Sequence, residues 1–240
     1  RDGFSRETTD GLPVNDKQIV EEFLPILEAW FGGEMAILYR SHPQRMQGAL
    51  LMGCPVFGDK YLDIFESYCL PTILSEKNLA ALAGRCVMVL FTDQPSSARL
   101  VMMIDQIESV GIDCQLIIIP PNVMAEAFSH PFNKYWILGV AQNAMIKMAG
   151  RAGMGFHMLM PDHVYAHEYF PNLFRLSQDY EGIAQTGISA HTEAFIELEE
   201  WRGPDNTIAI PDRNLGTIGW ANLHKQTRAA IMNDATIPND

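Results

Sequence analysis

The sequence predicts an α/β domain, with a mostly parallel central sheet flanked by helices and a helical C-terminal part. Two observations lead to this prediction. Short continuous apolar runs, typical of strands buried on both faces, alternate along the chain with amphipathic helical segments. The chain also has 240 residues, 48% of them hydrophobic and 19% charged. This globular composition supplies enough apolar material for a sizeable core.

The first half of the predicted sheet begins with an apolar run at residues 49–57 that ends at Gly58, as expected of a buried strand. Residues 60–74 then carry apolar side chains at helical spacing, and Pro71 disturbs the last turns of this helix. A short helical turn is expected at 78–83.

The second half repeats the alternation of strand and helix. Further strands are predicted where apolar runs stop at turn residues, at 86–91, 114–119 and 156–160. Helical spacing predicts helices at 96–110 and 134–149, and residues 164–240 read mainly as helices joined by loops.

The N-terminal residues differ from the rest in composition. Residues 1–48 are expected to form a polar leader and a helical extension, and residues 49–240 to form the α/β domain. Since the first residue is Arg1 and not Met, we expect this chain to be a piece of a longer one.

The net charge limits the kinds of partner that this chain is expected to bind. Acidic residues number 29 and basic residues 17, for a formal net charge of −12. Such a chain is not expected to bind nucleic acid or an anionic membrane surface, since both need clustered Lys and Arg. No apolar run approaches the length of a membrane span. The four cysteines include no CxxC pair and read as reduced core thiols, so we expect a cytoplasmic protein without a transmembrane segment.

Acidic residues follow three of the four predicted strands. Asp59, Asp93 and Asp162 each stand just past an apolar run. Ligands of open α/β sheets bind outside the carboxyl ends of the strands, so these residues favour a polar ligand site there. Ordinary turn and helix-capping chemistry also places Asp at such positions, and it remains an alternative for each one.

Several nucleotide and hydrolase motifs are missing. The chain has no Gly-rich dinucleotide fingerprint after a strand, no P-loop and no nucleophile elbow. His163 and His167 are four residues apart, a spacing that on a helix can chelate zinc, but no Glu lies between them as in the metalloprotease pattern.

Four stretches of the chain carry a resemblance to a known family. They are 56–65 with 69–74 and Asn78-Leu79, then 89–93, then 158–165, and last 210–215 with Leu223-His224. Together and in this order they resemble bacterial nucleotide-diphospho-sugar transferases of the GT-A type. The resemblance implies a Rossmann-like, GT-A-like fold for residues 49–240. It also implies transfer of a sugar from a nucleotide-sugar donor to an acceptor hydroxyl, in the synthesis of a polysaccharide or glycoconjugate.

The resemblance also implies roles for individual residues. Asp162 matches the second Asp of the Asp-x-Asp metal motif, and His163 follows it; these two are the expected catalytic residues. Asp162, His163 and His224 are the expected ligands of a divalent metal, Mn²⁺ or Mg²⁺. Met160 stands at the position of the first Asp, and its thioether is no ligand for these hard cations. The residues expected beside the nucleotide and its diphosphate are Gly58, Lys60, Thr92, Asp93, Lys147 and Arg151.

Two other functions stay open. The substitution at Met160 is also what we expect of a non-catalytic GT-A-like domain that binds ligands or acts as a scaffold within a larger protein. A metal-dependent hydrolase would use Asp162, His163, His167 and His191 instead.

Overall fold

Four parallel strands form a sheet in the order β3-β2-β1-β4. The structure is a computed structural model that describes residues 50–119, 121, 124–125, 129, 133–179, 183 and 187–228. The strands are β1 (Leu50–Pro55), β2 (Cys86–Thr92), β3 (Asp113–Ile118) and β4 (Gly155–Met158). The predicted extension over residues 1–48 lies outside the described residues.

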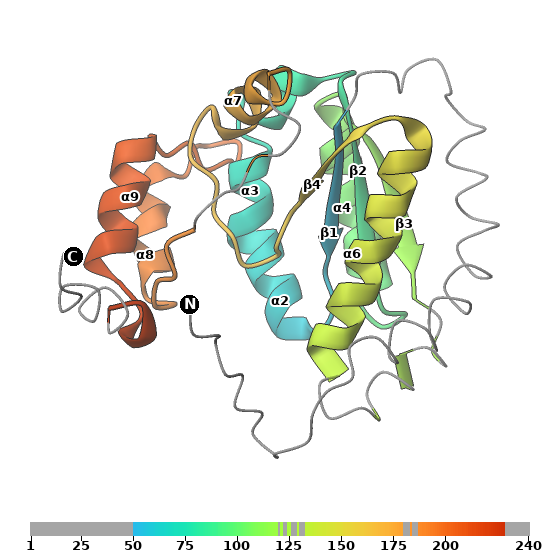
Figure 1. Cartoon of the computed structure of the whole chain (residues 1–240). Coiled ribbons are helices and arrows are strands. Elements are labelled where there is room, and N and C mark those ends of the chain that lie inside the picture. Colours follow the sequence, from blue (N-terminus) through green and yellow to red (C-terminus); the bar gives the residue numbers. More distant parts are fainter. Residues whose placement is uncertain are drawn as a thin grey trace, which may run out of the picture. The chain divides into compact units, whose positions relative to one another are not determined.

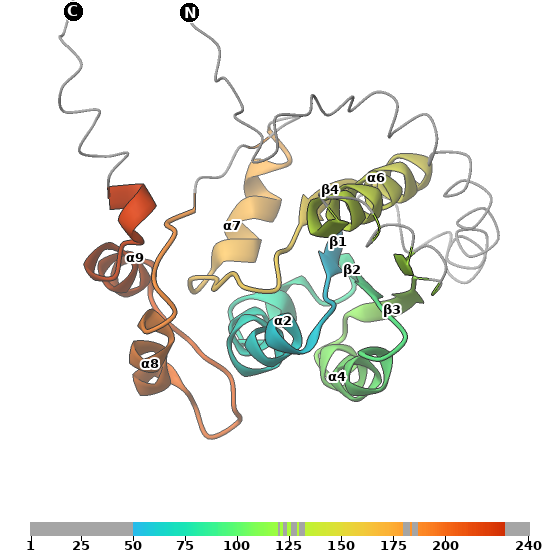
Figure 2. The ribbon, with the colours of Figure 1, turned by 90° about the horizontal axis from the view of Figure 1, so that it is seen from below.

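Helices cover both faces of this sheet. On one face lie α4 (Ser97–Ser109) and the helix that follows β1, made of α2 (Asp59–Ile64), the π-helical η1 (Phe65–Cys69) and α3 (Leu70–Ile73) (Figures 1 and 2). The long helix α6 (Asn133–Ala152) lies on the other face, against β1 and β4 (Figure 2). A short 3-10 helix, η2 (Leu79–Leu82), leads into β2. The predicted α/β fold with a parallel sheet is therefore confirmed, and the arrangement is Rossmann-like.

The C-terminal part contains short helices separated by loops. They are α7 (Tyr169–Leu176), α8 (Ala194–Leu198), the 3-10 helix η3 (Glu199–Trp201) and α9 (Asp212–Ala221). The sequence predicted a mainly helical segment here, but its Gly and Pro residues break it into short helices.

The core lies on both sides of the sheet. All six residues of β1 are buried, as are six of the seven residues of β2, in keeping with strands covered on both faces. Helix α6 approaches β1 closely at Gly53, where an added Cβ would lie 1.9 Å from the sulfur of Met145. Glycine at this position therefore lets the helix pack directly on the strand. Met145, Met148 and Met154 are buried and contribute to this core.

The helix after β1 departs from its prediction in one respect. The sequence predicted a single α-helix over 60–74, whereas residues 65–69 form a π-helical turn. Pro71 has no N–H to donate to the carbonyl of Ser67 four residues earlier, which is where a regular α-helix would place a hydrogen bond. None of the described helices is both long and apolar enough to cross a membrane.

Candidate functional site

The strand order creates a switch point between β1 and β4. From β1 the chain proceeds outward to β2 and β3, and then returns through α6 on the opposite face to place β4 on the other side of β1. The connection that follows β1 and the connection that precedes β4 therefore lie on opposite faces of the sheet. In open parallel sheets the ligand crevice lies outside the carboxyl ends of the strands at such a point. A ligand site is therefore expected at the carboxyl ends of β1 and β4.

Gly58 turns the chain at the end of β1. Its backbone φ is 78° and ψ is 140°, in the region that favours glycine, and its carbonyl accepts hydrogen bonds from the N–H groups of Tyr61 and Leu62 at 3.1 Å each. A Cβ built on Gly58 would meet nothing within 4 Å. The conformation requires glycine here, and the space beside its backbone is open.

Asp162 and His163 follow β4 on a tight turn. Leu159 continues the strand pairing by donating to the Gly53 carbonyl at 2.8 Å, and the His163 N–H donates to the Met160 carbonyl at 3.1 Å. Both Asp162 and His163 have exposed side chains, whereas Pro161 between strand and turn is buried. These two residues therefore stand at the carboxyl edge of the sheet, where the sequence predicted them.

The electrostatics of His163 favour the neutral imidazole. Partial desolvation by the surrounding protein lowers the pKa of His163 below its usual value, and the neighbouring Asp162 carboxylate offsets part of this shift. A neutral imidazole at pH 7 can accept a proton or donate a hydrogen bond, which is the state a general base requires.

A pocket of about 680 Å³ opens beside this turn. Its walls come from α2, from the loop that carries Asp162, from the segment around α8 and from α9. The polar and titratable side chains on these walls include Lys60, Asp162, His163, Tyr165, His191 and Asp212. Its volume is that of a typical small-molecule site, and both charge signs are present on its lining.

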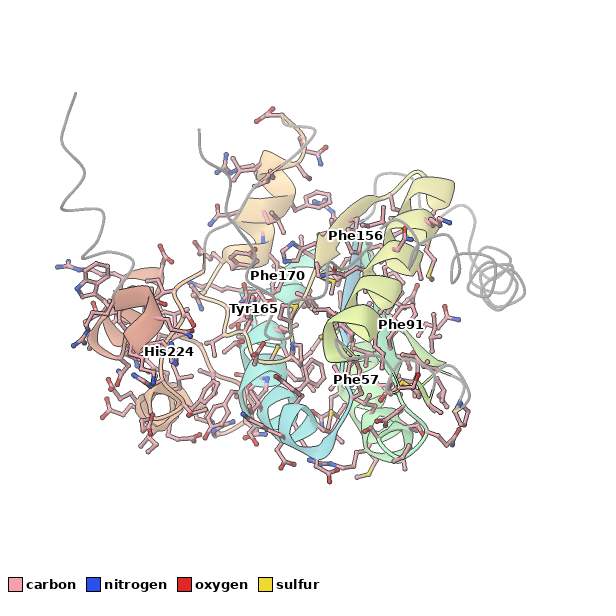
Figure 3. All side chains as sticks on the ribbon, turned by 60° about the horizontal axis from the view of Figure 1, so that its bottom comes forward. Phe57, Phe91, Phe156, Tyr165, Phe170 and His224 are labelled. Atoms are coloured by element: carbon pink, nitrogen blue, oxygen red, sulfur yellow. The ribbon has the colours of Figure 1, made fainter. Side chains whose placement is uncertain are left out.

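Tyr165 forms a buried part of the pocket wall. The residue is 3% exposed, and its ring packs on Phe170 with centroids 4.9 Å apart (Figure 3). Among the described residues, no group meets its hydroxyl with normal hydrogen-bond geometry. Burial raises the pKa of Tyr165 well above its usual value, which the nearby Met160 backbone N–H partly opposes. Because the hydroxyl itself is buried, Tyr165 contributes to the wall of the pocket without presenting this group to a ligand.

The other predicted nucleotide-binding residues do not all lie at the pocket. Lys60 lines it, but Thr92 and Asp93, at the end of β2, do not. The Asp93 carboxylate accepts a hydrogen bond from the Ser96 N–H at 2.8 Å just before α4, which is the turn chemistry considered as its alternative. Thr92 is fully buried, and its hydroxyl has no hydrogen-bond partner in the described part of the chain.

Lys147 and Arg151 belong to the last turns of α6, which lead directly into β4. This end of the helix adjoins the amino end of β4, whereas Asp162 follows the carboxyl end of that strand. The structure therefore does not bring these two positions to the strand end that carries Asp162 and His163.

His224 lies in the C-terminal part (Figure 3) and pairs with a second histidine. Its ring centroid is 5.0 Å from that of His191, and its Nδ1 accepts a hydrogen bond from the Gln226 N–H at 3.4 Å. His191 lines the same pocket as Asp162, whereas His224 is not among the residues that line it. Neither His163 nor His167 is helical, so their spacing does not place them on one helix face.

The donor set for a metal is sparse. In the described ranges, no three His, Cys, Asp or Glu side chains converge as metal ligands. A Mg²⁺ or Mn²⁺ ion takes oxygen ligands and is often held by one or two carboxylates together with substrate phosphates. Asp162 fits that pattern only if a bound substrate completes the coordination shell.

The cysteines take no part in the pocket. Cys54, Cys69 and Cys86 are buried, Cys114 is half-buried, and all four are free thiols. Burial raises the pKa of each thiol, to about 12 for Cys86 and Cys114. Thiols in this state are inert, as expected of core cysteines.

Three pocket residues carried no predicted role at this site. Tyr165 and Asp212 fall within the stretches on which the expected resemblance rests, and that was the signal they gave. His191 lies outside those stretches and entered only as a hydrolase ligand. Nothing in the local sequence of any of the three indicates that it reaches this pocket.

Comparisons with known proteins add no assignment. The chain matches no known protein family, and no curated protein or solved structure is significantly similar to it.

Proposed function

We propose that this protein is a glycosyltransferase that moves a sugar from a nucleoside-diphosphate donor to an acceptor hydroxyl. One observation carries the proposal: Asp162 and His163 stand on a pocket wall at the β1–β4 switch point of a parallel sheet, with Gly58 ending the neighbouring strand. The stretches that resemble GT-A transferases include all three of these residues. Support for the activity itself comes from that resemblance and from the chemistry of the pocket.

In the proposed reaction, the bond between the sugar C1 and the donor phosphate oxygen breaks, and an acceptor oxygen bonds to C1. The acceptor hydroxyl loses its proton, for which a neutral His163 is a suitable base. The diphosphate leaves with increased negative charge, and Lys60 on the same pocket supplies a positive charge to offset it. Asp162 would orient the sugar or hold a divalent cation against the diphosphate, and such a cation would supply further neutralisation of the leaving group.

A thermal-shift screen tests the proposal. UDP, GDP and CDP, with and without attached sugars, are added to the whole chain in Mn²⁺ or in EDTA. A ligand that binds the native state raises the melting temperature by mass action. We expect a shift that depends on the base, is reduced in Asp162→Asn, and persists in Asp105→Asn, a matched change on the exposed face of α4 away from the pocket. Absence of any shift with all of these ligands would overturn the proposal.

The measurement in EDTA distinguishes binding that requires a metal from binding that does not. Loss of the shift in EDTA would indicate a cation shared between Asp162 and the diphosphate. An unchanged shift would indicate binding without a metal, consistent with Met160 at the position of the first motif Asp.

A non-catalytic binding domain is the second candidate function. Met160 favours it, because a thioether at the position of the first motif Asp is no ligand for Mg²⁺ or Mn²⁺. Met160 is half-buried, and its carbonyl oxygen accepts hydrogen bonds from the protein. Nucleotide-sugar binding without transfer to any acceptor and without release of the nucleoside diphosphate would favour this function over the transferase.

A further inference from the structure

A buried segment with polar side chains makes hydrogen bonds to the loop that carries Asp162 and His163. This anchoring segment comprises residues 69–78, which begin at the last residue of the π-helical turn and lie far from the loop in sequence. Cys69, Thr72, Ser75 and Asn78 within it are all fully buried. Buried polar side chains are costly unless their hydrogen bonds are made, so the partners of this group are informative.

Two of these side chains bind the loop on either side of Asp162 and His163. The Cys69 thiol donates to the Met160 carbonyl at 3.4 Å, two residues before Asp162. The Tyr165 N–H donates to the Thr72 hydroxyl at 3.2 Å, two residues after His163. The Thr72 hydroxyl in turn donates to the Cys69 carbonyl at 2.8 Å, which links the two anchors.

Asn78 fixes the continuation of the same loop. Its amide nitrogen donates to the Ala166 carbonyl at 3.0 Å and to the Thr72 carbonyl at 2.9 Å. Its amide oxygen accepts from the Phe170 N–H at 3.4 Å. The anchoring segment thus satisfies four backbone groups between residues 160 and 170, and none of its hydrogen-bonding side chains lines the pocket.

We propose that Thr72 and Asn78 are positioning residues that hold the loop between Met160 and Phe170 in the conformation that presents Asp162 and His163 to the pocket. Their part in catalysis rests on the proposed function, but their effect on the loop does not. A side chain that is fully buried and bonded to two places on one loop restricts that loop more than packing alone does. The parts of the anchoring segment that carry the expected resemblance, 69–74 and Asn78, then act through the loop without contacting the ligand.

Amide hydrogen exchange on the whole chain tests the anchoring without any ligand. Thr72→Val replaces the hydroxyl with a methyl group and leaves the Tyr165 N–H without its acceptor. We expect the amides of Tyr165 and His163 to exchange roughly tenfold faster, the equivalent of one lost hydrogen bond, while the amides of β2 keep their rates. Thr72→Ser keeps the hydroxyl and is expected to restore slow exchange.

The matched control is Thr217→Val. Its hydroxyl donates to the Arg213 carbonyl at 2.9 Å within α9 and touches no part of the loop. This variant is expected to leave loop exchange unchanged. Equal acceleration in the loop and in β2 for Thr72→Val, or no acceleration in either, would overturn the proposal.

Cys69→Ala is the second variant, in case Thr72→Val does not fold. It removes one sulfur atom and with it the hydrogen bond to the Met160 carbonyl, which the His163 N–H shares. We expect selective acceleration at the His163 amide, and unchanged exchange there would contradict the anchoring.

The nucleotide thermal shift is then measured on the same variants. If the wild type shows a shift, Thr72→Val is expected to reduce it and Thr72→Ser to restore it. If the wild type binds no nucleotide, the proposed function fails, while the exchange rates still decide whether Thr72 holds the loop.

Discussion

His157 on β4 is a residue whose burial makes stability depend on pH. Burial lowers its pKa to about 4, and the nearby His163 adds to the effect. Between pH 6.5 and 4 the unfolded chain therefore binds a proton at this residue that the folded chain does not, so acidification favours unfolding. From pH 7 to pH 5 we expect His157 to remove about 2 kcal/mol from the free energy of unfolding.

Urea unfolding of the wild type and His157→Gln at both pH values measures this contribution. The variant is expected to lose less stability than the wild type on acidification, because Gln does not titrate. Parallel losses in the two proteins would show that His157 is not held neutral by the fold.

Two glycines give a paired prediction of opposite sign. Neither Gly58 nor Gly139 has any atom within 4 Å of a built Cβ, so in both cases the backbone conformation decides the effect of alanine. Gly58 has a φ of 78°, where alanine is strained by about 1–2 kcal/mol. Gly139 lies inside α6, where alanine is favoured over glycine by about 0.5–1 kcal/mol.

Thermal or urea denaturation of Gly58→Ala and Gly139→Ala tests the pair. The first variant is expected to be less stable than the wild type and the second more stable. A neutral Gly58→Ala would mean that the chain can turn after β1 without the left-handed conformation.

The contact between α6 and β1 depends on a missing side chain. A Cβ at Gly53 would overlap the sulfur of Met145, which is fully buried. Gly53→Ala therefore overpacks the interface, and we expect a loss of about 1–3 kcal/mol of stability. Met145→Ala makes a cavity instead, at a cost of about 2–5 kcal/mol.

The double variant, Gly53→Ala with Met145→Ala, completes a double-mutant cycle for the contact between α6 and β1. Because the new methyl group occupies space vacated by the methionine, the double variant is expected to be more stable than the sum of the single losses predicts. Strict additivity would show that α6 shifts away from β1 rather than packing on it.

The individual elements were predictable because their signals are local. The apolar runs at 86–91 and 114–119 correspond to β2 and β3 with ends shifted by one residue, and the helix predicted at 96–110 corresponds to α4. The π-helical turn was not predicted, because it depends on a helix continuing through Pro71. The order of the strands also escaped prediction, since β1 pairs with β4 about 100 residues later in the chain.

The site was predictable only as far as it is built from strand ends. Asp162 and His163 follow an apolar run, so their place at the sheet edge could be read from neighbouring residues. His191 and Asp212 reach the pocket because the C-terminal part docks on the helix after β1, where Phe195 stacks on Tyr68 and the Ile208 N–H donates to the Pro71 carbonyl. No local sequence pattern predicts these contacts. Asn78 stands in one of the stretches that carry the resemblance, but nothing in the sequence indicated its contacts, since its loop partners lie about 90 residues away.

The docking of the C-terminal part completes the pocket, and Arg202 joins this part to the helix after β1. Its guanidinium binds both carboxylate oxygens of Glu199, at 2.7 and 2.8 Å, and donates to the Ser67 carbonyl at 2.7 Å. That carbonyl lies four residues before Pro71 and so lacks the α-helical donor of a regular helix. The same guanidinium lies 5.8 Å from the ring centre of Tyr68, which stacks on Phe195 of α8.

Arg202→Lys keeps the charge but removes the planar set of donors that these partners share. Since hydrogen bonds to charged groups contribute about 1.5–3 kcal/mol, we expect a loss of about 2 kcal/mol in urea unfolding. Arg99→Lys is the matched control: Arg99 also pairs with two carboxylates, Asp63 and Glu66, but its side chain is 41% exposed against 19% for Arg202. Exposed ion pairs contribute little, so this control is expected to cost less than about 1 kcal/mol. Equal losses in the two variants would mean that Arg202 acts as a surface ion pair, and that the stacking of Tyr68 on Phe195 and the apolar contacts around Leu198 and Ile208 hold the C-terminal part in place.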